Sequence, residues 1–97
     1  MFELTYDLED IDAKIFYGVN NQYFNVIKST FPTLKITGRD HHIFAMGNQE
    51  ALDIFKQKLD DIVGFISKNN SIGLKDVENI LNIKDENEKQ LVFDQDI

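Results

Sequence analysis

The sequence predicts a single α+β domain in which helices cover one face of an antiparallel sheet. Residues 2–8 alternate apolar and polar side chains with the period of a half-buried strand. Residues 49–66 instead repeat apolar side chains at helical spacing over four turns or more. Two short apolar segments between them, 33–37 and 43–46, are close enough to form a hairpin. A three-stranded antiparallel sheet has to bury one face, and the helices are the available cover.

The first two elements are expected to be a strand over residues 2–8 and a short helix that ends near Tyr17. The strand has an apolar face made of Phe2, Leu4, Tyr6 and Leu8. Acids at positions 9–12 suit a helix N-terminus, where free N–H groups and the helix dipole favour negative charge. Gly18 is expected to end this helix, since glycine accepts a left-handed C-terminal cap without strain.

A second helix is expected after Asn20 or Asn21, either of which can act as the N-cap. Its apolar stripe consists of Tyr23, Phe24, Ile27 and Phe31. Pro32 is expected to end it, because proline disfavours helical geometry in the preceding residue.

The hairpin follows, with strands over residues 33–37 and 43–46 and turn chemistry at 38–41. Gly47 closes its second strand. Asn48 then supplies the N-cap of the long helix. Gly64, within this helix, lowers its stability by up to about 1 kcal/mol relative to alanine. Residues 67–70 end that helix, and residues 74–81 predict a short additional one.

The C-terminal region is expected to be a linker. Residues 1–82 form the predicted domain and residues 83–97 a flexible acidic segment, because 85–90 is too polar to pack. The β-prone cluster at 91–93 has no evident partner. We therefore expect the sequence to be a truncated piece of a longer protein, with a further domain after it.

The charge is unevenly distributed around a formal net value of −7. Residues 1–12 carry five acids and no base, residues 46–97 carry eleven acids and six bases, and residues 13–45 carry four bases and one acid. A basic middle third favours an anionic partner, while chance unevenness in a small protein is the alternative.

Several classes of protein are disfavoured by composition. The chain has no cysteine, so a disulfide framework and thiol chemistry are excluded. It has no apolar run near the ~18 residues of a membrane helix, and its start lacks the pattern of a secretory signal. We expect a cytoplasmic protein.

The predicted order of elements, with a glycine turn between the first two helices, is similar to the KH domain. In that fold a Gly-x-x-Gly turn contacts the phosphates of a single strand beside a groove for about four bases. The corresponding turn here is Gly18-Val19-Asn20-Asn21, so asparagine replaces the second glycine. Asparagine tolerates left-handed geometry, but it places a side chain where phosphate would approach.

A more specific resemblance is to the N-terminal, KH-like region of the PhoH family of phosphate-starvation-type proteins. It covers about residues 2–82, and the stretch "IFYGVNNQYFNVIKSTFPTLKITGRDHHIFAMGNQEALDIF" carries it. The matching residues are Phe16, Gly18, Asn20, Ile27, Leu34, Ile36, Gly38, Arg39, Ile43, Gly47 and Asn48.

This resemblance implies a cytoplasmic, RNA-linked protein whose P-loop ATPase domain follows the present sequence and binds ATP and Mg. No Gly-x-x-x-x-Gly-Lys-[Ser/Thr] motif occurs in these 97 residues. We therefore expect this chain to have no cofactor and to be a non-catalytic part of the protein.

The candidate nucleic-acid site is the turn together with nearby bases. Its members are Lys14, Gly18, Val19, Asn20, Asn21, Lys28, Lys35 and Arg39. The turn meets a helix N-terminus, which attracts anions, but it is also what a simple helix–turn–helix joint requires. Lys35 and Arg39 are candidates for phosphate contact or base stacking, or else charges on a solvated hairpin.

Other candidates are weaker. Tyr17 and Tyr23 flank the turn and could stack on bases or anchor the helix pair in the core. His41 and His42 suggest zinc, but adjacent strand side chains diverge and no cysteine is present. No nucleophile, metal set or acid pair predicts catalysis.

Two functions remain open from the sequence. In the first, the domain binds RNA or single-stranded DNA weakly and presents it to the ATPase domain. In the second, it is a protein-interaction or oligomerisation module that docks on the ATPase domain or on neighbouring subunits. The net charge and the asparagine in the turn favour the second, and the basic block favours the first.

Overall fold

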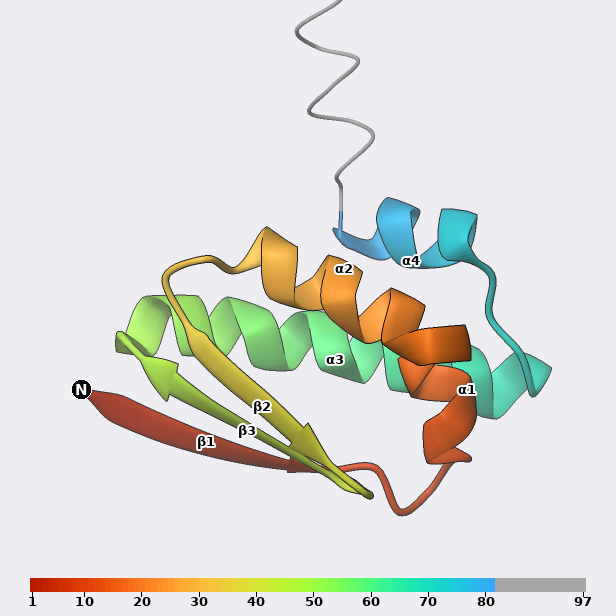
Figure 1. Cartoon of the computed structure of the whole chain (residues 1–97), viewed down its shortest axis with the longest axis horizontal. Helices are drawn as coiled ribbons and strands as arrows, with labels where there is room; N and C mark the ends of the chain where they lie inside the picture. Colours follow the sequence, from red (N-terminus) through yellow and green to blue (C-terminus); the bar gives the residue numbers. More distant parts are fainter. Residues whose placement is uncertain (82–97) are drawn as a thin grey trace, which may run out of the picture.

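The computed structural model describes residues 1–81, which form an antiparallel three-stranded sheet with helices packed on one face (Figure 1). The strands are β1 (Phe2–Asp7), β2 (Lys35–Arg39) and β3 (His42–Gly47), in the spatial order β1-β3-β2. Both neighbouring pairs are antiparallel. The predicted α+β class and three-stranded sheet are confirmed. The predicted linker over 83–97 lies outside the described residues.

Four α-helices and one 3-10 turn complete the described chain. They are α1 (Ala13–Tyr17), η1 (Val19–Asn21), α2 (Gln22–Thr30), α3 (Gln49–Asn69) and α4 (Leu74–Leu81). In Figure 1, α3 runs along the sheet, and α1 and α2 lie beside α3. The helix α4 lies next to α2, on the side away from the sheet. The helix α4 packs against α2 and α3. Among these residues no helix is long and apolar enough to cross a membrane.

The start of α1 differs from the prediction, because only the last of the four residues at 9–12 belongs to a helix cap. The Asp12 carboxylate accepts a hydrogen bond from the Lys14 amide at 3.0 Å. The upstream acids belong to a turn in which the Asp7 side chain accepts from the Glu9 amide and Ile11 donates to the Leu8 carbonyl. Local side-chain acceptors therefore delay the helix until Ala13.

The hairpin is tighter than predicted, since β2 extends to Arg39 and only Asp40 and His41 remain between the strands. Asp40 has φ 53°, a left-handed conformation that short polar residues tolerate. A two-residue connection of this kind matches the natural twist of the paired strands. Gly38, expected in the turn, is therefore a strand residue.

The core lies between the sheet and the helices. On α3 the buried stripe predicted from the sequence is present, and Asn48 caps this helix by accepting from the Ala51 amide at 2.8 Å. Burial of each large apolar side chain contributes about 1.5–3 kcal/mol. The fully buried large side chains are Phe16, Phe55, Leu8, Ile27, Ile43, Leu59, Ile62, Ile66 and Val77.

A polar contact joins the sheet to α3 at the edge of this core. The Tyr6 hydroxyl donates to the Asp60 carboxylate across 54 positions of sequence. Burial, followed by the hydrogen bond to Asp60, raises the pKa of Tyr6 above its usual value. The neutral phenol is therefore the form that fits the fold.

Gly38 is the point where the α1–α2 pair meets β2. A Cβ atom at this position would lie 2.8 Å from the Tyr17 hydroxyl oxygen and 2.9 Å from Cζ of Phe24. The two rings form an edge-to-face pair with centroids 5.1 Å apart, and Phe24 is buried. The absence of a side chain at Gly38 therefore allows both helices to approach the edge strand.

We expect Gly38→Ala to lower the free energy of unfolding by about 1–3 kcal/mol, because the added methyl group overpacks the two rings. Gly64→Ala is the matched control, since a Cβ there meets nothing within 4 Å. In the exposed interior of α3 that change should stabilise by about 0.5–1 kcal/mol. Urea denaturation of both variants measures the two values, and equal effects would contradict the packing role of Gly38.

Candidate nucleic-acid interface

The turn between α1 and α2 has an unusual backbone. Gly18 has φ 80°, and both Asn20 (φ 56°, ψ 32°) and Asn21 (φ 60°, ψ 28°) are left-handed. The Asn21 amide donates to the Gly18 carbonyl at 3.1 Å and closes the turn. Asparagine is one of the few residues that adopts this conformation at low cost, so its presence at both positions is explained by geometry.

Asn21 precedes α2 without capping it through its side chain. Its left-handed backbone occupies the N-cap position, and no side-chain hydrogen bond to the helix accompanies it. The predicted position of the helix start is therefore nearly right, but the predicted capping bond is absent. The side chain of Asn21 is exposed instead, at the rim of the turn.

Tyr23 fixes the turn to the rest of the fold. A Cβ at Gly18 would lie 2.7 Å from Cδ2 of Tyr23, so the ring packs directly on the glycine. The Tyr23 hydroxyl donates to the Ile72 carbonyl at 3.1 Å, in the connection between α3 and α4. Both tyrosines considered for base stacking are thus held by packing: Tyr23 on Gly18, and Tyr17 between Phe16 and Phe24.

Two backbone amides open the 3-10 segment of the turn. Val19 and Asn20 are the first residues of η1, and the first N–H groups of a helix have no acceptor within it. Val19 is 77% exposed, so solvent reaches this segment freely. Successive unpaired N–H groups in a left-handed turn form a concave surface of positive partial charge that suits an anion.

One of the predicted basic residues, Lys14, lies beside this turn, and a second, Lys28, lies in the last turn of α2. Lys14 lines a shallow hollow of about 240 Å³ together with Gly18, Val19 and Tyr23. Lys28 lies two turns along α2, where its ammonium nitrogen is 5.5 Å from the centroid of the Phe24 ring. Both side chains are exposed, so either can contact a bound strand without losing a buried partner, and Lys14 is the one that lies at the turn itself.

The other two predicted bases lie elsewhere. On β2 the inward positions are Ile36, which is buried, and Gly38, so the alternating residues Lys35 and Arg39 point to the opposite face of the sheet. The structure does not bring them together with the turn.

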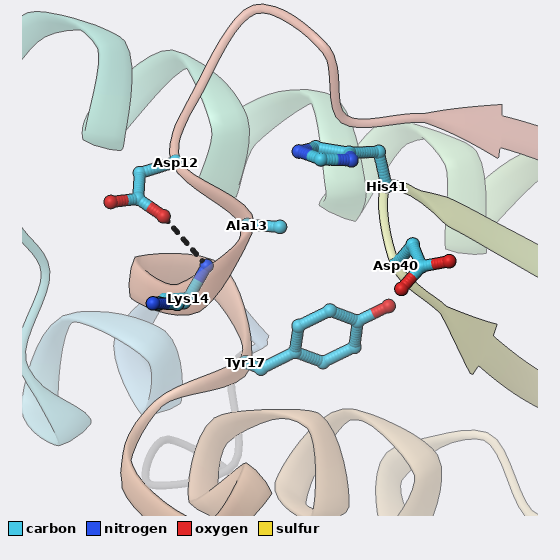
Figure 2. Close-up of a pocket in the computed structure, with 6 residues that line it drawn as sticks. All are labelled: Asp12, Ala13, Lys14, Tyr17, Asp40 and His41. Atoms are coloured by element: carbon cyan, nitrogen blue, oxygen red, sulfur yellow. Dashed lines mark hydrogen bonds between the residues drawn. The ribbon is translucent and has the colours of Figure 1, made fainter.

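An acidic pocket lies beside α1, on the side of the β2–β3 turn (Figure 2). It encloses about 520 Å³ and is lined by Asp12, Ala13, Lys14, Tyr17, Asp40 and His41. The Tyr17 hydroxyl points toward Asp40 in Figure 2 but has no hydrogen-bond partner among the described residues. Burial, with the Asp40 charge as a second cause, raises the pKa of Tyr17. The two carboxylates disfavour a phosphate in this pocket.

The two histidines lie in different surroundings. His41 lines the acidic pocket, whereas His42 lies on the outer face of the sheet with its ring 6.2 Å from that of Phe44. No group of three or more potential metal-ligating side chains occurs in the described part of the chain.

The sequence has no match among family models, curated proteins or solved structures. The resemblance to KH domains and to the PhoH family therefore depends on the residues quoted above.

The left-handed backbone at position 21 allows a direct test of the turn. We expect Asn21→Val to lower the free energy of unfolding by about 1–2 kcal/mol, since a β-branched residue is strained at φ 60°. Asn21→Gly should keep or slightly raise stability, because glycine adopts this conformation freely. Thermal unfolding of both variants gives the comparison. A tolerated valine would show that the turn is not left-handed at this position.

Proposed function

We propose that this chain is a KH-like accessory domain that binds single-stranded nucleic acid, RNA or DNA, through the turn between α1 and α2. The observation that carries the proposal is the exposed start of η1, where the amides of Val19 and Asn20 have no acceptor within the helix. The β-α-α-β-β-α order of the elements and the edge position of β2 beside this helix pair support it.

In this proposal the phosphates of the strand contact the turn, Lys14 supplies positive charge beside it, and Lys28 contacts the strand farther along α2. Phosphate binding of this kind does not depend on base sequence. The net charge of −7 opposes association at long range, so binding should be weak and strongly dependent on salt. Lys35 and Arg39 have no part in it, because they face the other side of the sheet.

The wider context of the proposal is the PhoH-type protein that the sequence resembles. The domain would present a strand to an ATPase domain that follows it, and ATP and Mg would bind there. The chain itself would be non-catalytic, and the protein would work in the cytoplasm.

A second candidate function is protein interaction, and the acidic pocket is the observation that favours it. Asp12 and Asp40 line the same pocket as Lys14 and reduce the positive potential on that side of α1. In this case the domain docks on its own ATPase domain without nucleic acid. Light scattering of the two separate domains tests it, and no complex at micromolar concentrations would count against docking.

The nucleic-acid proposal predicts that Lys14→Glu combined with Lys28→Glu weakens binding to a short single-stranded RNA by about tenfold or more. The loss of two phosphate contacts should also reduce the slope of log K against log salt by about 1.4. Electrophoretic shifts at two or more salt concentrations, with RNA and DNA of the same sequence, measure both effects.

Lys56→Glu combined with Lys68→Glu is the control, because it changes the net charge equally on α3. It should alter binding only slightly. The proposal is wrong if wild-type protein binds neither strand at low salt, or if both double variants weaken binding alike.

A further inference from the structure

The outer face of the sheet, which no helix covers, carries an ordered pattern of charge. Residues that are directly opposite in neighbouring strands project to the same face. The strand register therefore arranges nine outward side chains in three rows. The rows, each read from β1 through β3 to β2, are Glu3–Met46–Lys35, Thr5–Phe44–Thr37 and Asp7–His42–Arg39.

The two edge strands carry opposite charges on this outer face, on either side of a central threonine. The β1 edge is acidic, with Glu3 and Asp7, and the β2 edge is basic, with Lys35 and Arg39. Opposite charges in one row are two strands, or roughly 9.6 Å, apart, which is too far for an ion pair within the sheet. Among residues 1–81 none of these four charges forms an ion pair.

The central strand supplies an apolar ridge between the two charged edges. Phe44 is 40% exposed, Met46 is half-buried, and the ring of His42 lies beside Phe44. An exposed phenylalanine in the middle of an open sheet face costs free energy in water, and a covering partner would recover it. Charge on both sides of the ridge restricts what that partner can be.

A second copy of the same face is complementary to this pattern. Rotation by 180° about an axis parallel to the strands exchanges the positions of the two edges and leaves the rows in register. Glu3 of one copy then lies over Lys35 of the other, and Asp7 lies over Arg39. Phe44 meets Phe44 across the axis, so every outward charge faces its opposite and the ridges cover each other.

We propose that the outer face of the sheet is a self-association surface through which two copies of this chain form a two-fold symmetric dimer. Aligned sheets pack face to face at about 10 Å, a distance that phenylalanine and methionine side chains can fill. A polyanion fits the face less well, because the acids of β1 line one full edge. This inference is independent of the proposed nucleic-acid function, which uses the turn.

The size of the face sets the strength of the dimer. Three strands spaced at about 4.8 Å and about five residues long give a patch of roughly 14 by 17 Å per copy. This is below the area of a standard stable interface. Association of the full chain is therefore expected to be weak and transient, and visible only at high protein concentration.

Sedimentation equilibrium of the 97-residue chain, up to about 1 mM, tests the proposal with charge-reversed variants. One variant carries Glu3→Lys and Asp7→Lys, which makes the face wholly basic, and the other carries Lys35→Glu and Arg39→Glu, which makes it wholly acidic. Each alone should associate at least about tenfold more weakly than wild type, because like charges then face each other. An equimolar mixture should form heterodimers.

Controls separate association from folding. The Asp7 side chain also accepts from the Glu9 amide, so Glu3→Lys alone replaces the first variant if circular dichroism shows that the double change disturbs folding. Lys56→Glu combined with Lys68→Glu changes the net charge without touching the face, and it should leave dimerisation unchanged.

The proposal is supported if wild type dimerises, the two variants do so weakly and their mixture recovers dimers. It is overturned if wild type stays monomeric at 1 mM, or if the variants and wild type dimerise alike. Single-stranded RNA that binds wild type and is lost on Lys35→Glu with Arg39→Glu, with wild type monomeric, would assign the face to nucleic acid instead.

Discussion

The contact of Tyr17 and Phe24 with the bare backbone of Gly38 determines how the α1–α2 pair lies on the sheet. The edge-to-face rings fill the space above the glycine, so α1 and α2 approach the edge strand β2 closely. Because these helices are held against the core, the segment that joins them has to project outward. The exposed turn at Gly18–Asn21 is therefore a consequence of packing some distance away from it.

Within the turn, backbone conformation and side-chain packing act together. Tyr23 covers Gly18 from the inside and is tied to Ile72, so the inner side of the turn is rigidly supported. On the outer side, two consecutive left-handed asparagines keep the chain from closing into a regular helix, and the amides of Val19 and Asn20 open η1 without an acceptor within it. A supported turn with free donors loses little conformational entropy when it binds an anion.

Local signals in the sequence predicted the elements well, while tertiary contacts decided the details. Asn48 is an N-cap because its own side chain reaches Ala51, a local interaction. For Gly38, in contrast, the sequence predicts a turn. The strand needs glycine there because the rings of Tyr17 and Phe24, which are far away in sequence, pack against it. The outward direction of Lys35 could be predicted from its alternation with Leu34 and Ile36. The charge pattern of the outer face could not be predicted from the sequence, because it depends on the register of three strands.

The most direct test of the exposed turn is a ¹H–¹⁵N nuclear magnetic resonance titration of the chain with a short single-stranded RNA at low salt. Uncovered amides that contact phosphate predict the largest shift changes at Val19, Asn20 and Asn21, reversed by added salt. Resonances of the turn that do not move, or shift changes centred on Thr37 and Phe44 of the outer face, would contradict phosphate binding at this turn.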